Sequence, residues 1–249
     1  MILFQKKSKL ALLLIIALVL FMVTLLIPPF PQPVSYYDFA DKRMFFGIPH
    51  TSDIFSNILI FGFGIYGIIF LLCHRLQQTT RAEKILWILF FAIVALSAIF
   101  SSYFHLQPND LRLALDRIGL SFLFMSFLSL MLIERLGEKI GLAIAPLLFL
   151  LGIGSVLYWI KFQDLRFYAL IQFGSLLFLL PLFLFFPSTK PGKGFLFLAL
   201  GLYALGKICE LWDESIFWML KNTLSGHALK HLLSSAGVLA LIAYLRCRK

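Results

Sequence analysis

The chain has 249 residues, of which 61% are hydrophobic and 14% charged, and its mean hydropathy is +0.93. A soluble domain is nearer to about 45–50% apolar and about 25% charged, so this composition excludes an ordinary soluble protein. The formal net charge is +10, but no basic and aromatic cluster lies in a soluble segment, so we expect no nucleic-acid partner.

Apolar runs long enough to cross a hydrocarbon core, which takes roughly 20 residues, occur eight times. In chain order they are 10–27, 54–73, 85–104, 111–133, 140–160, 167–186, 194–212 and 227–245. The connections between them are short and carry the charges and prolines. The pattern predicts an all-α integral membrane protein.

The first run follows Lys6, Lys7 and Lys9, and a secretory signal peptide is one interpretation of it. Signal peptides have an apolar region of about 7–15 residues and a small-residue cleavage site. Here the run is 18 residues long and "PPFPQP" follows it. We therefore predict a transmembrane anchor within residues 1–30 and a bundle of seven transmembrane helices over residues 31–249.

Lysine and arginine collect in alternate connections, as they do where connections face the cytoplasm. With the N-terminus in the cytoplasm, 13 of the 22 basic residues fall in cytoplasmic segments. Both termini are then cytoplasmic. The net charge is mostly a sign of this topology.

Polar side chains inside the apolar runs gather at one end of the predicted helices. Such residues are costly in a membrane and are functional candidates by default. With the alternation above, each lies at the outer end of its helix. We call this set the polar layer: Asp53, Asn57, Ser101, His105, Asp116, Arg117, Lys207, Glu210, Asp213, His227, Lys230 and His231. We expect no such cluster at the cytoplasmic ends, where Glu83, Glu134 and Glu138 stand beside Lys and Arg.

Helical spacing relates several of these residues to one another. Residues four apart share a helix face, so His227 and His231 point the same way, as do Ser101 and His105. Ser225 fits the N-cap position of the last helix, whose positive end favours neutral imidazoles. Three histidines with an open fourth position are the arrangement of a catalytic zinc site.

Simpler explanations exist for the same residues. A single interfacial histidine is more often hydrogen-bonded than metal-bound, and five histidines can produce a His-x-x-x-His pair by chance. Asp116 beside Arg117 is equally an ion pair at the membrane edge. The gathering of the polar layer at one end favours the metal site over these explanations.

Five residues of the polar layer form a pattern that resembles the alkaline ceramidase family, within the CREST group of seven-helix membrane hydrolases and adiponectin-receptor-like proteins. The pattern is Ser-x-x-x-His, an Asp eleven residues later and a late His-x-x-x-His. Ser101 and His105 in "SSYFH", Asp116 in "LALDR", and His227 and His231 in "GHALKH" match it. The resemblance covers roughly residues 37–245 and is nearest to the bacterial branch, which implies the bacterial inner membrane.

The resemblance implies an intramembrane zinc amidase of sphingolipid or related lipid metabolism. Its substrate would be a membrane lipid, ceramide or another N-acyl lipid, cleaved to a free fatty acid and a sphingoid base or other amine. His105, His227 and His231 would hold zinc with water as the fourth ligand. Asp116 would move the proton of that water to the leaving amine, and Ser101 would donate to the developing oxyanion. The site would face the outer, periplasmic side.

The chain departs from this family before its first core helix. Eukaryotic members hold calcium there with an acidic and amide cluster, whereas this chain has Arg43 and His50 near Asp38 and Asp41. Arg43 would repel a cation, so we do not predict calcium, and whether a calcium site persists near Asp38 and Asp41 stays open. Two other functions stay open: a receptor-like or lipid-binding protein that keeps zinc with little hydrolysis, and a channel or transporter, which needs polar residues in both halves of the membrane.

Overall fold

The computed structural model describes residues 2–249, with side chains described from Lys7 onward. Met1 and the side chain of Lys6 lie outside the described residues. Within this range the chain is helical apart from turns, loops and one isolated antiparallel bridge between Phe45 and Ile48. The predicted all-α fold is confirmed for this part of the chain.

Among the described residues, eight helical segments are long and apolar enough to cross a membrane. They are α1 (Ile2–Leu26), α2 (Thr51–Cys73), α3 (Arg81–Leu106), α4 (Asp110–Leu136), α5 (Glu138–Phe162), the continuous series α6 (Arg166–Ala169), η2 (Leu170–Gly174) and α7 (Ser175–Phe185), α8 (Lys193–Leu211) and α10 (Gly226–Arg246). Each predicted run corresponds to one of these segments. Large apolar side chains such as Ile69 and Leu150 are exposed along them, as expected for helices that lipid surrounds.

Three smaller features were not predicted. A single 3₁₀ turn, η1 (Val34–Tyr37), precedes α2, and a short helix, α9 (Asp213–Met219), follows α8. The segment η2 is a π-helical turn within the sixth span. Hydropathy cannot reveal any of them, because each is only a few residues long.

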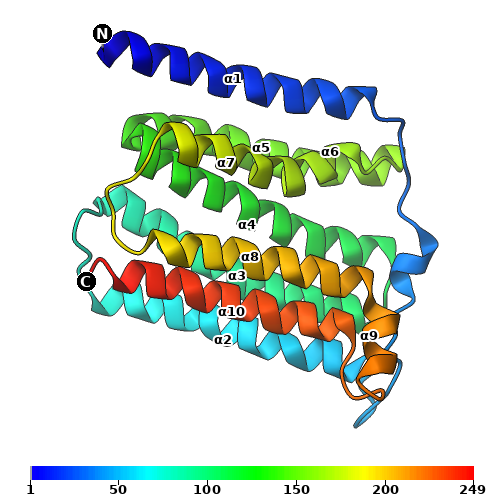
Figure 1. Cartoon of the computed structure of the whole chain (residues 1–249). Coiled ribbons are helices and arrows are strands. Elements are labelled where there is room, and N and C mark those ends of the chain that lie inside the picture. The colour runs from blue at the N-terminus through cyan, green and yellow to red at the C-terminus, as the bar shows by residue number, and fades with distance from the viewer. Residues whose placement is uncertain (1) are drawn as a thin grey trace. The chain divides into compact units, whose positions relative to one another are not determined.

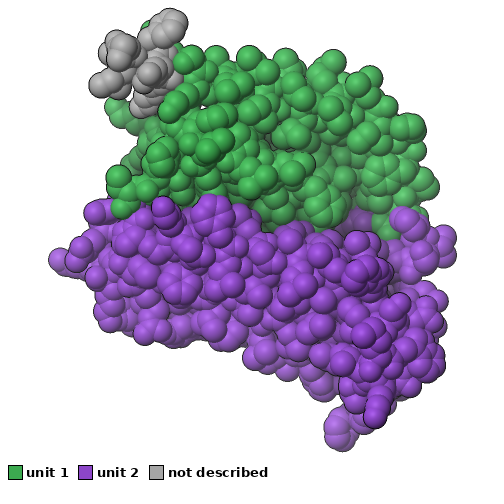
Figure 2. Space-filling view, viewed as in Figure 1, with its two compact units in different colours: residues 1–32, 120–189 green, residues 33–119, 190–249 purple. Residues whose placement is uncertain are grey.

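The helices form two compact units, which Figure 2 shows in different colours. The first comprises residues 1–32 and 120–189, and in it α1 contacts α7. The second comprises residues 33–119 and 190–249. The predicted anchor and seven-helix bundle describe membrane insertion rather than packing, and they stay a prediction.

In the second unit α10 packs against both α8 and α2, and α2 packs against α3 (Figure 1). Side-chain caps define where several helices begin. Ser225 accepts a hydrogen bond from the N–H of Ala228 at 2.9 Å, which confirms it as the cap of α10. Asn109 accepts from the N–H of Arg112 at 3.0 Å and begins α4 in the same way. The polar ends of α2, α3, α8 and α10 lie at the end of this unit where α9 contacts α8 and α10 (Figure 1).

A buried charge cluster at the opposite ends of these helices corrects the sequence analysis. Glu83 is 2% exposed and accepts hydrogen bonds from Lys190 Nζ at 2.7 Å and Arg248 Nη1 at 2.8 Å. The expectation that no polar cluster forms there is therefore wrong. Lys190 and Arg248 lie 107 and 165 positions from Glu83, so helical spacing could not relate the three residues.

Candidate metal centre

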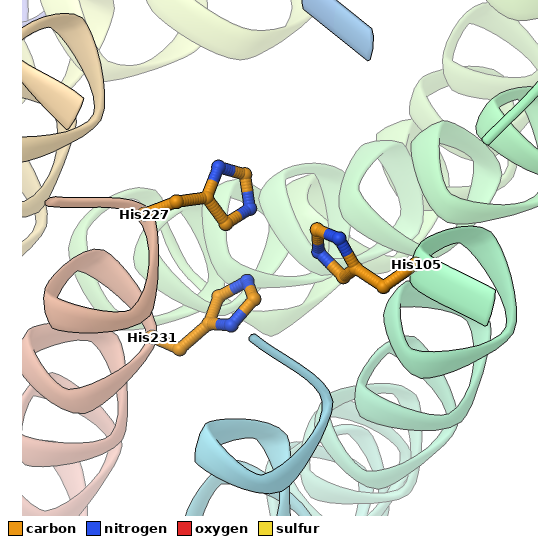
Figure 3. A group of neighbouring side chains, drawn as sticks. All are labelled: His105, His227 and His231. Atoms are coloured by element: carbon orange, nitrogen blue, oxygen red, sulfur yellow. The ribbon is translucent and has the colours of Figure 1, made fainter. Parts of the chain in front are cut away.

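Three imidazoles meet at the polar ends of the second unit (Figure 3). His105 lies in the last turn of α3, and His227 and His231 lie in the first two turns of α10. One nitrogen of each lies within 4.8 Å of the others, and the ring centroids are 4.8–5.5 Å apart. All three side chains are buried. The structure therefore brings together the predicted triad, which could hold a metal ion.

The surroundings of His231 and His105 fit a metal ion. Nδ1 of His231 lies 2.9 Å from Ser56 Oγ and 3.1 Å from the carbonyl oxygen of Asp53. A carbonyl only accepts, so this contact assigns the proton to Nδ1 and leaves the Nε2 lone pair for a metal. Nδ1 of His105 is a buried atom without a hydrogen-bond partner among the described residues. Such an atom is costly unless an ion or another group meets it.

His227 is positioned by the end of α8 and the start of α9. Its backbone N–H donates to Asp213 Oδ1 at 2.7 Å. A β-carbon on Gly226 would overlap the backbone of Cys209 and Asp213, so only glycine lets α10 begin this close to α8. Nε2 of His227 lies 2.8 Å from Lys230 Nζ. An ammonium group only donates, so this nitrogen accepts from Lys230, and a metal ion would bind the same lone pair only in place of that hydrogen bond.

The two predicted catalytic residues belong to the same unit as the triad. Ser101 Oγ accepts a hydrogen bond from Asn57 Nδ2 at 3.2 Å. Asp116 lies in the second turn of α4 and is 8% exposed. The charged groups that act on it electrostatically include Lys230 as well as Arg117. Asp116 is therefore influenced by α10 and not only by its neighbour in sequence, while its catalytic role stays a prediction.

Two carboxylates of the polar layer, Asp213 and Asp53, hold the segments around the triad. Asp213 Oδ2 accepts from the N–H of Ala40 at 3.0 Å, while its other oxygen holds the start of α10. The side chain of Asp53 accepts from Ser225 Oγ at 3.0 Å, while its carbonyl oxygen holds His231. These residues fix the helices that carry the histidines.

Two residues of the site were missed in the sequence. The buried ring of Phe39 has its centroid 4.6 Å from that of His105 and 4.8 Å from that of His227, so it packs against two of the three imidazoles. An apolar residue in a connection carries no signal of such a position. Ser56 stands one residue before Asn57 in "SDIFSN", and its place on the polar end of α2 was the available signal.

Arg43 forms an ion pair with Asp41 in the segment before α2. Arg43 Nε and Nη2 donate to the two oxygens of Asp41 at 2.8 and 2.6 Å, and Nη2 also donates to the carbonyl of Thr223 at 2.9 Å. Burial raises the pKa of Asp41, but hydrogen bonds from Arg43 and Ser52 outweigh it and hold that pKa below its usual range. Nδ1 of His50 lies 3.0 Å from the carbonyl of Asp41. The positive charge in this segment therefore comes from the chain itself.

No model of a known protein family matches the chain, and a comparison with curated proteins found no significant match. The resemblance to alkaline ceramidases thus depends on the pattern of five residues. Any function has to be argued from the chemistry of the site.

Proposed function

We propose that the chain is a zinc-dependent amidase of the alkaline ceramidase type, which hydrolyses the N-acyl amide of ceramide or a related membrane lipid. The observation that carries the proposal is the buried triad of His105, His227 and His231, which could hold a metal ion. Catalytic zinc sites combine three protein ligands with one open position, and three clustered imidazoles can supply those ligands. The buried carboxyl group of Asp116 supplies the acid–base group that amide hydrolysis needs.

Zinc, when bound, supplies a Lewis acid that polarises an amide carbonyl and makes water more acidic. Asp116 accepts a proton from the attacking water and passes it to the leaving nitrogen as the C–N bond breaks. Ser101 donates a hydrogen bond to the carbonyl oxygen as that oxygen becomes negative. The amide of Asn57 donates to Ser101 Oγ at 3.2 Å, which leaves the hydroxyl proton of Ser101 available for the substrate.

The position of the site supports a lipid substrate. The triad lies within helices that are long and apolar enough to cross a membrane, close to their ends. The amide of an N-acyl lipid joins its acyl chain to its polar part, so it would lie at a similar depth. From the distribution of lysine and arginine we place both termini in the cytoplasm and the site toward the outer side of a bacterial inner membrane.

The test is release of fatty acid from a panel of N-acyl lipids that includes ceramide, measured by mass spectrometry on purified protein in lipid nanodiscs. We expect release to stop when zinc is removed by a chelator and to return when zinc is restored. His50→Ala is the control, because His50 contacts the carbonyl of Asp41 and is not a proposed ligand.

Two outcomes would contradict the proposal. Zinc binding without release from any lipid would favour the receptor-like or lipid-binding alternative. Release that persists in the chelated protein would exclude a zinc amidase.

A further inference from the structure

Lys230 places a positive charge directly beside the candidate metal centre. It lies three residues after His227 and one before His231, so its side chain starts close to both on α10. Its Nζ lies 2.8 Å from Nε2 of His227 and 2.8 Å from Oε1 of Glu210. A cation this close to a ligand repels a metal ion, so metal binding alone does not explain a lysine at this position.

The positive charge of Lys230 also acts on most of the ionisable groups of the site. Its side chain is 17% exposed, and its helix approaches α8 closely because Gly206 lies against its backbone. The buried groups on which its charge acts are Asp53, His105, Asp116, Glu210, His227 and His231. An anion bound among these groups would therefore lie within reach of the positive charge of Lys230.

The charges of the polar layer do not cancel when a divalent metal ion is present. Glu210 is shared between two lysines, because Lys230 pairs with one of its carboxylate oxygens and Lys207 with the other. Across the layer, three basic side chains and a divalent ion exceed four carboxylates by one positive charge. The side chains counted are Arg117, Lys207 and Lys230 against Asp53, Asp116, Glu210 and Asp213. An unbalanced charge is expensive in a buried site, and an anionic substrate group would balance it.

We propose that Lys230 determines specificity and that the substrates are acidic N-acyl lipids of the N-acyl amino acid class. Their carboxylate lies one carbon from the amide nitrogen, so it can receive a hydrogen bond from Lys230 while the amide carbonyl faces the triad. This inference rests on the proposed amidase function. Water adds to the carbonyl, the C–N bond breaks, and a proton goes to the nitrogen, which yields a fatty acid and a free amino acid.

The experiment compares N-palmitoylglycine, which carries a carboxylate, with N-palmitoylethanolamine, which carries a neutral hydroxymethyl group in its place. In wild type we expect kcat/KM for the acid to be at least about tenfold higher, since hydrogen bonds to charged groups contribute a factor of this order or more. Lys230→Met should raise KM for the acid about 10–100-fold and change KM for the neutral probe little. Lys230→Arg keeps the charge and should keep the preference. Lys221→Met, which removes an exposed lysine, should change neither probe.

Binding is measured separately, from the shift in Tm that each probe causes in detergent-solubilised wild type and variants. Equal turnover of both probes would overturn the inference and leave the amidase proposal standing. An equal loss for both probes in Lys230→Met would also overturn it, because the lysine would then serve the reaction rather than selectivity. A Lys230-dependent Tm shift by the acid without turnover would support charge recognition and refute the amidase. Absence of both turnover and charge-dependent binding would overturn both proposals.

Discussion

Removal of one imidazole tests the metal centre most directly, and His231 is the ligand with the best-defined surroundings. Its Nδ1 is held by Ser56 Oγ and by the carbonyl oxygen of Asp53, and its side chain is 4% exposed. His231→Ala removes a ligand from a buried site in which bulk water cannot simply replace it. His105 and His227 stay as the only proposed protein ligands.

The expected loss follows from the free energy of zinc binding. Four-ligand zinc sites bind with about 10–16 kcal/mol at neutral pH, which corresponds to about 2.5–4 kcal/mol for each ligand. A factor of ten corresponds to about 1.4 kcal/mol, so His231→Ala should weaken zinc binding about 10²–10³-fold. Ser56→Ala removes one of two partners of Nδ1 and leaves the Asp53 carbonyl, so we expect a loss of about tenfold, the lower limit for groups that orient a ligand.

The assay is zinc content after purification together with competition against a chromophoric chelator. Wild type should hold about one zinc ion per chain, as three histidines and an open position imply. His50→Ala should bind zinc like wild type, and affinity should fall in the order His50→Ala, Ser56→Ala, His231→Ala. If His105→Ala, His227→Ala and His231→Ala all bind zinc as wild type does, the three histidines are not the ligands.

Three other consequences can be measured. Asp116→Asn should keep zinc but lower kcat by about 10²–10⁴-fold. Ser101→Ala should also keep zinc and cause the smaller loss, at most about 10²–10³-fold in kcat. Normal kcat in a zinc-loaded Asp116→Asn protein would remove Asp116 from the mechanism. Glu83→Gln should lower stability by about 3–5 kcal/mol, because the buried Arg248 and the partly buried Lys190 both lose a charged partner, and should leave zinc content unchanged; an unchanged Tm would contradict this. Reporter fusions at Gln78 and Gln107 should report cytoplasmic and external locations, and the reverse would overturn the assigned orientation.

Hydropathy was sufficient to predict the helices, because a span needs only length and apolar composition. The eight predicted runs match the eight segments, and the ends differ because capping residues set them. Ser225 could be identified as a cap from its residue type and position. The short helix α9 could not be identified, because its seven residues are too few for a hydropathy signal.

The histidine triad was predictable for a different reason. Two of its members are four residues apart on one helix, and the third lies at the same end of another helix by the alternation of the spans. The contacts that complete the site have no such regularity. Phe39 reaches the triad from a connection, and the Glu83 cluster joins three segments that are distant in sequence. Periodicity describes one helix at a time, so contacts between connections and helices escape it.

Lys230 shows how the structure changes the meaning of a residue that the sequence had already singled out. In the sequence it is one of several basic residues near the outer ends of the helices, where lysine is less common than on the cytoplasmic side. In the structure its Nζ contacts both Glu210 and His227, so it is neither a lipid-facing charge nor a topology signal. A lysine at this position opposes metal binding and needs a buried carboxylate to hold it. Weaker metal binding and the need for a carboxylate partner are both explained if the positive charge also binds a group other than Glu210 and His227. A negatively charged substrate is the group that the chemistry of this site favours.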